Sequence, residues 1–446
     1  MNLTVPTILT GPTLSNLFLS LSSSSTSPPP TSPSLSPSPS SSLSWKSYLV
    51  PAFLAYALLC RTLRFRREKA LRRKFGFPEG DRAALARMTN DQAQQIIRFL
   101  MTWEFPLFHY LSLEFALFKT YGVETISRLL LATRNLTDPI KSRKRYEDTG
   151  ALIGEFMINA PTSERALRGL ARVNYLHSPY VAAGQITNDD LLYTLSVFVT
   201  EPRRFARRYE WRALNDAEVC AYGVFWKAVG DALGVQYAGC LPRNGAWADG
   251  IEFFEDIEAW AKDYEVKAMR PSPIAAKPAE ALFPMILYWV PWFARDFAAQ
   301  IVCVLLGDRA REAFMLPEPD ILPAAVVYST LALRRFVLRH LCLPRLSELR
   351  RILDADPATG RYRQRRSYGH YPFYVAPTLW NRWGPLAWAV WLYGGKVPGD
   401  DPLVHMPQGY RFEDLGPEKY RGKGVREAEA DVERLRGSKR GGCPFG

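Results

Sequence analysis

Residues 145–180 read RYEDTGALIGEFMINAPTSERALRGLARVNYLHSPY, two stretches of helical pattern that lead to one scarce residue. The second stretch follows a capping signal at residues 162–164 and predicts a helix over Ala166–Leu176. His177 is one of only five histidines in 446 residues, and it stands just before Ser178-Pro179. Histidine is the usual protein ligand for haem iron and for many other metals. Its scarcity sharply limits where such chemistry could lie.

Helical patterning continues outward from this stretch. Few segments alternate with period two, and there is no β-α-β rhythm. The sequence therefore predicts an all-α fold, a helical bundle over residues 81–436. Helices are expected over Asp91–Met101, after Asn188–Asp190, after Asn215–Glu218 up to Gly234, over Ile251–Met269, and over Ala281–Leu306 with interruptions at Pro284 and Pro291.

The composition favours a globular protein with a large apolar interior or a ligand cavity, since 47% of the residues are hydrophobic and 13% aromatic. The six cysteines are scattered without any C-x-x-C pair, so neither a zinc knuckle nor a disulfide scaffold is indicated. The net charge of +13 comes without RNP, helix-turn-helix or zinc-finger spacing, and no nucleic-acid partner is expected.

The N-terminal region predicts a membrane anchor. Residues 1–44 end in a Ser/Pro/Thr-rich run and should form a disordered tail. Residues 45–63 are apolar and predict a single transmembrane helix, with an interfacial or buried helix as the alternative. A basic juxtamembrane segment, residues 64–80, follows. By the positive-inside rule it should face the cytosol, so that residues 45–74 contact lipid and the bulk of the protein is cytosolic.

Two further segments have unusual compositions. Residues 371–395 are rich in aromatic side chains, which suits core packing, the wall of an apolar pocket or a second membrane-touching surface. Residues 437–446 are rich in glycine and charge and predict a flexible C-terminal tail.

Several enzyme classes lack their motifs in this chain. There is no H-E-x-x-H, G-x-S-x-G, Walker A or G-x-G-x-x-G. No histidine is followed two residues later by Asp or Glu, so the usual start of a non-haem iron facial triad is missing. No cysteine has the surroundings of a thiolate haem ligand, so any bound iron should be held through imidazole. The remaining histidines, His109, His340, His370 and His405, suit packed or surface positions.

The helix before His177 presents a mostly apolar or small face toward it. Gly169 on that face would let a flat macrocycle approach the backbone, beside Val173. This predicts His177 as a metal ligand, with Gly169 and Val173 in contact with a cofactor. The alternative is an imidazole that caps a helix C-terminus. Arg165, Arg168 and Arg172 should lie on another side, toward solvent or an anionic surface.

Arg145 and Thr149 are four residues apart and share a helical face. An arginine beside a hydroxyl can hydrogen-bond a polar oxygen species or a haem propionate. The alternative is an ordinary exposed arginine next to a helix-terminal threonine. The spacing alone does not decide between these two interpretations.

These residues resemble those of a known family: the oxygenase domain shared by the bacterial latex-clearing rubber oxygenases and the fungal ER-bound oxygenases of mycophenolic acid biosynthesis (MpaB-like). The likeness to the fungal members is much closer and runs from about residue 45 to the end. It rests on RYEDTGALIGE (Arg145–Glu155), the R-x-x-x-L-H element that ends at His177, NDDLLYTLSVFV (Asn188–Val199), EFPLF (Glu104–Phe108), ALFKTYGVETIS (Ala116–Ser127), FWKAVGDALG (Phe225–Gly234), WNRWGPLAW (Trp380–Trp388), VPGD (Val397–Asp400) and PQGY (Pro407–Tyr410).

The resemblance implies an all-α oxygenase that uses O₂ and a b-type haem to cleave an isoprenoid C=C bond. His177 matches the family's haem ligand, and Arg145 and Thr149 match a functional Arg-x-x-x-Thr pair. Where rubber oxygenases place a distal lysine, this chain has Asp148, which leaves the sixth position of the iron open or held by water. The fungal relative cleaves a prenyl side chain on an aromatic polyketide, which implies a hydrophobic substrate and an ER membrane location.

Three functions are therefore considered. The first is a membrane-anchored haem oxygenase acting on a prenylated or terpenoid secondary metabolite, with Arg145, Asp148 and Thr149 as catalytic residues. The second is a membrane-surface binding protein without the cofactor, an alternative that Asp148 leaves open. The third is a hydroxylase or dehydrogenase of secondary metabolism on the same fold. The sequence does not determine the oligomeric state.

Overall fold

The computed structural model describes residues 46–133, 139–288, 290–365, 371–438 and 440–445. It divides into two units, residues 1–52 and residues 53–446, and of the first unit only 46–52, the start of helix α1, is described. The tail expected over residues 1–44 and His370 lie outside the described residues.

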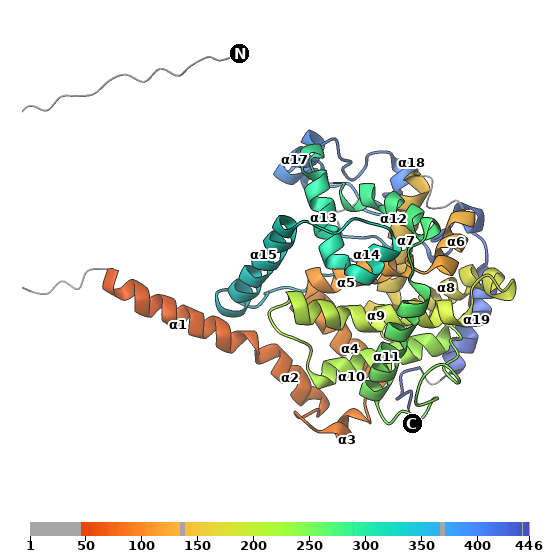
Figure 1. The fold of residues 1–446 in the computed structure, drawn as a ribbon, viewed down its shortest axis with the longest axis horizontal. Helices are drawn as coiled ribbons and strands as arrows, with labels where there is room; N and C mark the ends of the chain where they lie inside the picture. The colour runs from red at the N-terminus through yellow and green to blue at the C-terminus, as the bar shows by residue number, and fades with distance from the viewer. Residues whose placement is uncertain (1–45, 134–138, 289, 366–370, 439, 446) are drawn as a thin grey trace, which may run out of the picture. The chain divides into compact units, whose positions relative to one another are not determined.

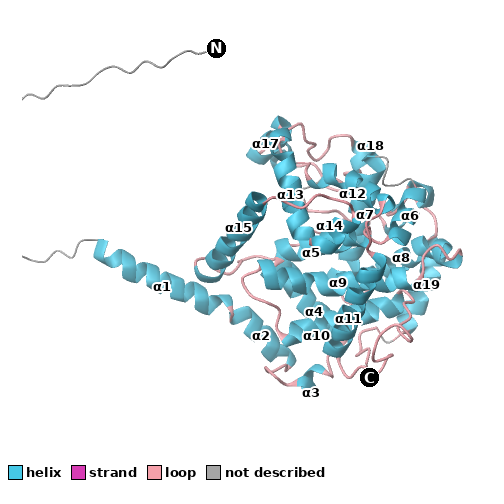
Figure 2. Ribbon diagram, viewed as in Figure 1, coloured by secondary structure: helices cyan, strands magenta, loops and turns pink. Residues whose placement is uncertain are grey.

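The prediction of an all-α fold is confirmed. Figures 1 and 2 show helices joined by loops, and the described residues form no strand beyond two isolated β-bridges. The helices are α1 (Lys46–Arg64), α2 (Arg66–Phe75), α3 (Arg82–Leu85), α4 (Asn90–Phe99), the π-helix η1 (Leu100–Glu104), α5 (Pro106–Thr120), α6 (Glu124–Ala132), α7 (Pro139–Ile158), α8 (Glu164–Ala182), α9 (Asn188–Tyr209), α10 (Asp216–Ala232), α11 (Gly250–Ala268), α12 (Pro273–Ile286), η2 (Trp292–Ala294), α13 (Arg295–Leu306), α14 (Asp308–Ala313), α15 (Ile321–His340), α16 (Leu379–Trp383), α17 (Pro385–Leu392), α18 (Pro402–His405), η3 (Phe412–Asp414), η4 (Glu418–Tyr420) and α19 (Val425–Gly437).

Local capping explains where the central helices begin. Thr89 and Gln92 form a capping box at α4, and Asn215 and Glu218 form one at α10. The Asp249 carboxylate accepts hydrogen bonds from the first backbone N–H groups of α11. These starts match the sequence prediction within the usual uncertainty of helix ends.

Pro284 and Pro179 lie inside helices, where a break was expected. Pro284 lies inside α12, whereas Pro291 precedes the short helix η2, as expected. Pro179 lies inside α8, which continues to Ala182. Proline has no N–H for the carbonyl four residues earlier, and here the Ser178 hydroxyl donates to that carbonyl, on Tyr175, at 3.2 Å.

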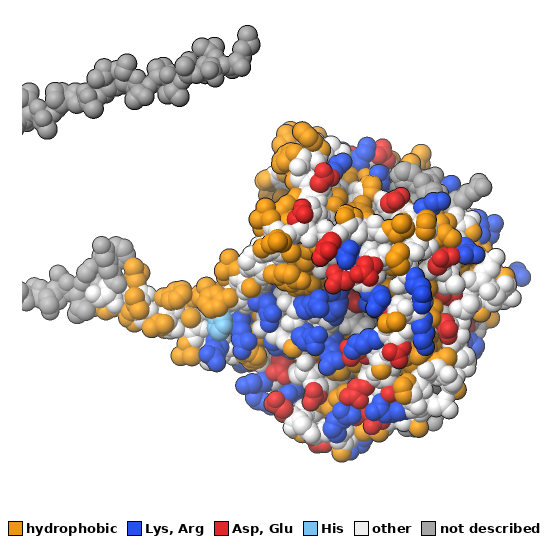
Figure 3. All heavy atoms as spheres, in the orientation of Figure 1, with side chains coloured by type: hydrophobic (Ala, Val, Ile, Leu, Met, Phe, Trp, Pro, Cys, Tyr) orange, Lys and Arg blue, Asp and Glu red, His pale blue; other side chains and the backbone are white. Residues whose placement is uncertain are grey.

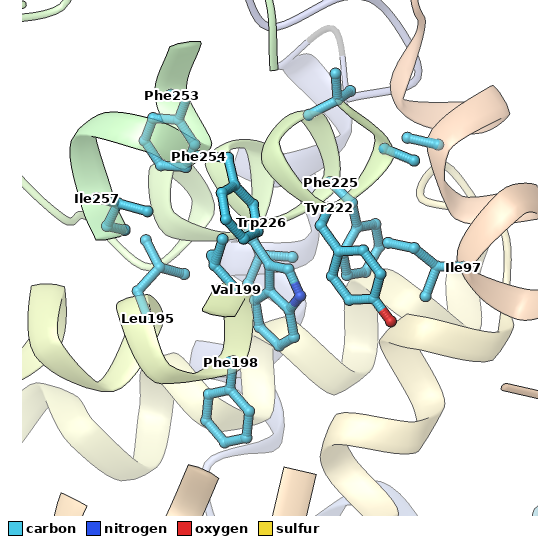
Figure 4. Close-up of a cluster of buried hydrophobic side chains, with 14 of the residues drawn as sticks. Ile97, Leu195, Phe198, Val199, Tyr222, Phe225, Trp226, Phe253, Phe254 and Ile257 are labelled. Atoms are coloured by element: carbon cyan, nitrogen blue, oxygen red, sulfur yellow. The ribbon is translucent and has the colours of Figure 1, made fainter. Parts of the chain in front are cut away.

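The core lies where α4, α9, α10 and α11 meet. Figure 4 shows aromatic and branched side chains from these helices pointing toward one another, with Trp226 of α10 above Phe198 of α9. Their rings stack with centroids 5.2 Å apart. Helices α10 and α11 approach so closely that a Cβ on Gly223 would lie 1.8 Å from the carbonyl oxygen of Gly250. Only glycine fits at this crossing.

Helices α7 and α8 pack side by side, and the chain after residue 404 covers them. Arg172 of α8 is buried, and its guanidinium donates to the backbone carbonyls of Glu413, Leu415, Tyr420 and Lys423 at 2.7–3.0 Å. The expectation that it faces solvent is therefore wrong.

Arg165 also turns inward, because it pairs with the fully buried Glu155 at 2.6 Å. Only Arg168, which pairs with Glu164 on the same helix, stays half exposed. An arginine whose donors meet carbonyls or a buried carboxylate can lie inside the protein, and neighbours in sequence do not reveal such partners.

The basic segment 64–80 packs against the helical domain. Glu68 of α2 is buried and accepts a hydrogen bond from the Asn215 side chain at 2.8 Å. Arg67 stacks over the Trp103 ring at 4.5 Å. Phe77 belongs to the main core.

The C-terminal residues also pack, in contrast to the flexible tail expected over 437–446. The Asn90 side chain donates to the carbonyl of Arg440, and its backbone N–H donates to that of Gly442. Arg440 is buried, and Phe445 packs against Trp247. The glycine- and charge-rich composition suggested mobility, but here the segment supplies partners to buried groups of α4 and α10.

Exposed apolar side chains gather on particular elements. Helix α15 and the helical stretch from Ser47 are each long and apolar enough to cross a membrane, and both are mostly exposed within the described residues. Trp380 of α16, Leu392 of α17 and Trp292 of η2 are each at least 75% exposed. Figure 3 shows hydrophobic side chains over the region of α13, α15 and α17. Patches of this kind mark protein or membrane contacts.

Candidate active site

A cavity of about 290 Å³ lies between helices α5 to α10 and the segment at residues 416–420. Its wall is mostly apolar, as expected for a site that binds a small molecule or a cofactor. Sequence-predicted residues border it from two helices. They are Arg145, Asp148 and Thr149 of α7 and Val173 and His177 of α8.

His177 faces this cavity. Part of the residue's surface is accessible, although surrounding protein desolvates the ring. The accessible surface therefore borders the cavity and not open solvent. This desolvation, aided by the Arg145 charge, lowers the pKa of His177 to about 4. The imidazole is therefore neutral at physiological pH, the form that binds metals.

The capping alternative for His177 does not match the structure. Helix α8 continues for more than a turn past His177, to Ala182. None of the hydrogen bonds among the described residues involves the ring of His177. Both ring nitrogens remain available for a ligand in the cavity.

Arg145 and Thr149 lie four residues apart on α7, and both border the cavity. The spacing alone had left this open. The guanidinium of Arg145 is half-buried and forms no ion pair within the part of the chain that the structure describes. The Thr149 hydroxyl donates to the Arg145 backbone carbonyl at 2.9 Å, which fixes its orientation on α7. An unpaired, partly buried guanidinium suits an anionic or strongly polar ligand group.

Asp148 borders the same cavity, but its carboxylate already has partners. One oxygen accepts from the Tyr374 hydroxyl, and the other accepts from Lys144 Nζ at 2.7 Å and from the Gly416 N–H at 2.9 Å. Burial raises the pKa of Asp148, and the Lys144 ammonium opposes this rise. These contacts join α7 to the C-terminal segment, so Asp148 positions the cavity wall.

Gly169 is not brought to the cavity. A Cβ at this position would meet Glu155 Cβ at 3.4 Å and the Leu152 carbonyl at 3.6 Å, both on α7. The small residue therefore allows close packing of α8 against α7. Helical spacing places Gly169 and His177 on one broad face of α8, but the two residues lie two turns apart. The part of this face at Gly169 packs against α7, and the part at His177 borders the cavity.

Sequence reasoning missed some residues of this site. Trp226 of α10 borders the cavity, and its buried Nε1–H has no partner among the described residues. Tyr121, at the end of α5, borders it near the Arg145 charge. Each lies in a stretch that carries the family resemblance, Ala116–Ser127 for Tyr121 and Phe225–Gly234 for Trp226, and that resemblance is the only signal that could have pointed to them.

The donor set fits a haem. A porphyrin supplies its own nitrogen ligands, so its iron needs only one neutral imidazole from the protein, and His177 is such a group. Arg145, which has no ion-pair partner among the described residues, offers a cation for a propionate, and the wall is apolar enough for a macrocycle. Among the described residues, no group of three or more His, Cys, Asp or Glu side chains is placed to hold a bare metal ion.

Comparison with known proteins gives the family. Residues 132–338 match the family described as ER-bound oxygenase mpaB/B'/Rubber oxygenase, catalytic domain. The chain is 41% identical to ER-bound oxygenase mpaB' of Penicillium brevicompactum over 407 residues, which cover 91% of this chain and 96% of that protein. The chain belongs to this family.

Two other relatives agree with this assignment. ER-bound oxygenase mpaB of the same species is 40% identical over 84% of this chain and 89% of its own length. That of Penicillium roqueforti (strain FM164) is 42% identical over 61% of this chain and 91% of its own length. The chain is therefore an O₂-dependent oxygenase, and the matched residues include α7 and α8, which carry Arg145 and His177.

Proposed function

We propose that this oxygenase depends on haem b and cleaves a C=C bond in the prenyl or terpenoid side chain of a hydrophobic secondary metabolite. The observation that carries the proposal is His177: a neutral imidazole that has no hydrogen-bond partner among the described residues and borders an apolar cavity. The cleavage reaction and the substrate class are inferred from the resemblance to rubber oxygenases and to the fungal relatives.

Each of the cavity residues His177, Arg145 and Thr149 then has a distinct role. His177 holds the iron. Arg145 binds a propionate or another anionic group, and Thr149, fixed through its bond to the Arg145 carbonyl, presents its oxygen to the cavity. The apolar wall excludes water from the reacting groups. Haem, when bound, supplies the O₂ chemistry that side chains lack.

Membrane attachment at the endoplasmic reticulum is part of the same proposal. Three relatives are named ER-bound, and the helical stretch from Ser47 is apolar and long enough to span a bilayer. The cations between residues 61 and 74 support a cytosolic catalytic domain. A substrate with a prenyl chain partitions into lipid, which makes attachment useful.

The absorption spectrum of the detergent-purified protein tests the proposal. Wild type should contain about one haem per chain and show a Soret band, and His177→Ala should lose it. His340→Ala is the matched control, since His340 lies at the end of α15 against Phe336 and borders neither cavity. Haem dependence would be refuted if the purified wild-type protein were colourless and its absorption spectrum did not change on addition of hemin.

Product labelling tests the reaction. Cleavage of a C=C bond in a farnesyl-substituted phenol under ¹⁸O₂ should place label in both carbonyl fragments before exchange with water. Label in a single hydroxyl group would indicate hydroxylation and would contradict cleavage.

A further inference from the structure

A second cavity of about 310 Å³ lies beside the first. It is formed by η1, α5, α7 and the segment at residues 345–365. The two cavities share part of their walls, namely Leu117 of α5 and Tyr146, Thr149 and Ile153 of α7. Thr149, four residues after Arg145, therefore stands between the cavity that His177 borders and a cavity of similar size with no assigned role.

Gly150 of α7 opens onto this second cavity. It borders the hollow and has free surface in the middle of a helix that is otherwise largely covered. A Cβ at Gly150 would meet no atom within 4 Å. By contrast, a Cβ at Gly154, one turn later, would lie 2.4 Å from Ile352. Helix packing therefore explains Gly154 but leaves the space at Gly150 open.

The chemistry of the lining is uneven. Most of the wall is apolar, with Met101, Leu107 and Leu113 among its members, but the segment at residues 345–365 contributes several arginines. Arg350 and Arg351 are neutralised by Asp354 and Glu147.

Two more arginines of the same segment line the cavity. Arg345 and Arg365 are exposed and form no ion pair with any residue that the structure describes. A molecule with an apolar body and one anionic end would satisfy both parts of the wall.

The segment that carries Arg345 adjoins surface that suits a lipid phase. Arg345 follows α15, and the neighbouring Leu346 is 94% exposed. The hydroxyl of Tyr56 and the guanidinium of Arg64, both on α1, donate to the carbonyls of Leu341 and Leu343 at 3.1 and 3.2 Å. The start of this segment is thus held next to the C-terminal part of the apolar N-terminal helix.

We infer that the second cavity is the substrate chamber, and that it takes an elongated apolar molecule with an acidic group at one end. The acid lies at Arg345 and Arg365, and the apolar chain extends past Gly150 toward the wall at Thr149. This inference rests on the proposed function for its catalytic meaning, but binding to the chamber does not require haem.

Photo-crosslinking of the full-length protein in detergent tests it. The probe is a C18 fatty acid with a diazirine at mid-chain, and the analogous C18 alcohol reports on the acid group. After irradiation, mass spectrometry of the peptides should place the acid probe within residues 101–117, 146–158 and 345–365. Excess oleic acid should compete.

The variants separate the chamber from other apolar surfaces. Gly150→Phe fills the space and should reduce labelling of these peptides at least tenfold, whereas Gly150→Ala should reduce it little. Gly437→Phe is the matched control, because a Cβ at Gly437, on α19, also meets nothing within 4 Å and this residue borders neither cavity. Arg345→Gln with Arg365→Gln should lower labelling by the acid about tenfold, to the level of the alcohol.

Three results would overturn the inference. They are labelling confined to α1 and α15, labelling of the His177 cavity in place of the chamber, or chamber labelling that Gly150→Phe leaves unchanged while circular dichroism shows a native fold. The Soret band is recorded for every sample. A protein without haem whose chamber still labels specifically refutes the proposed function alone, and a haem-loaded protein without chamber labelling refutes only this inference.

Discussion

Two interior histidines show how surroundings decide a residue's role. His109 of α5 is 5% exposed, and both of its ring nitrogens lack a partner among the described residues. Burial lowers the pKa of His109 to about 3. His177 is also neutral but borders the first cavity beside Arg145, whereas His109 borders the second cavity. From the sequence alone both are single histidines among apolar residues, and the two cavities that they border are built by helices distant in sequence.

The low pKa of His109 predicts acid sensitivity. Between pH 6.5 and about 3 the unfolded chain binds a proton at this residue and the folded chain does not, so stability falls as pH falls through this range and levels off below it. At pH 5 the loss is about 2 kcal/mol relative to neutral pH. His109→Phe, which keeps the stacking on Tyr222, should lack this loss.

Urea unfolding of both proteins at pH 7.5 and pH 5, in the same detergent, measures the effect. The difference in unfolding free energy between wild type and His109→Phe should shift by about 2 kcal/mol in favour of the variant at pH 5. An equal difference at both pH values would mean that His109 is protonated, or partnered, in the folded state.

At the scale of helices, the beginnings were predictable and the contacts were not. Thr89, Asn215 and Asp249 cap helices through their own nearby backbone, so the sequence reveals them. Gly169 and Arg172 act through α7 and through residues beyond 412, and spacing within α8 could not show those partners. The sequence therefore predicted a cofactor beside Gly169 and solvent around Arg172, whereas the structure places α7 beside Gly169 and backbone carbonyls around Arg172.

Two glycine substitutions should differ sharply in stability. Gly169→Ala adds a methyl group at ordinary contact distance within a helix, so it should leave stability unchanged or raise it by up to about 1 kcal/mol, with unaltered haem content. Gly223→Ala forces a Cβ into the Gly250 carbonyl and should cost more than about 3 kcal/mol or prevent folding.

Thermal unfolding followed by circular dichroism compares the two variants with wild type. A large loss of haem in a stable Gly169→Ala protein would restore the role first expected for Gly169, contact with a flat macrocycle. Equal stability of Gly223→Ala and wild type would contradict the close crossing of α10 and α11.

At the scale of the whole molecule, the all-α class and the apolar N-terminal helix follow from composition and periodicity. The cavities do not. The lining of the first extends from Leu117 to Tyr420, and the second joins α5 to residue 365. Such a space depends on how helices cross, which a single sequence does not specify. The exposed apolar surface of α15 was likewise not anticipated.

Membrane attachment through α1 can be tested in the full-length protein. Leu54 and Leu58 are at least 60% exposed, and replacing both with Glu would place two carboxylates in the bilayer, at about 5 kcal/mol or more. The double variant should move from the pellet to the supernatant on alkaline carbonate extraction of microsomes. Val266→Glu with Val425→Glu, on exposed apolar residues of α11 and α19, should stay in the pellet.

Retention of the Leu54→Glu, Leu58→Glu variant in the carbonate pellet would show that α1 is not the anchor. Helix α15, the second helix of sufficient length and hydropathy, would then be the element to change next.

Chemical rescue tests whether His177 is the protein ligand of the haem iron. Replacing His177 with glycine leaves room for free imidazole in the cavity. We expect His177→Gly to lose the Soret band of wild type and to regain its position and intensity on addition of millimolar imidazole. A His177→Gly protein that retains one haem per chain with the wild-type spectrum, without imidazole, would contradict it.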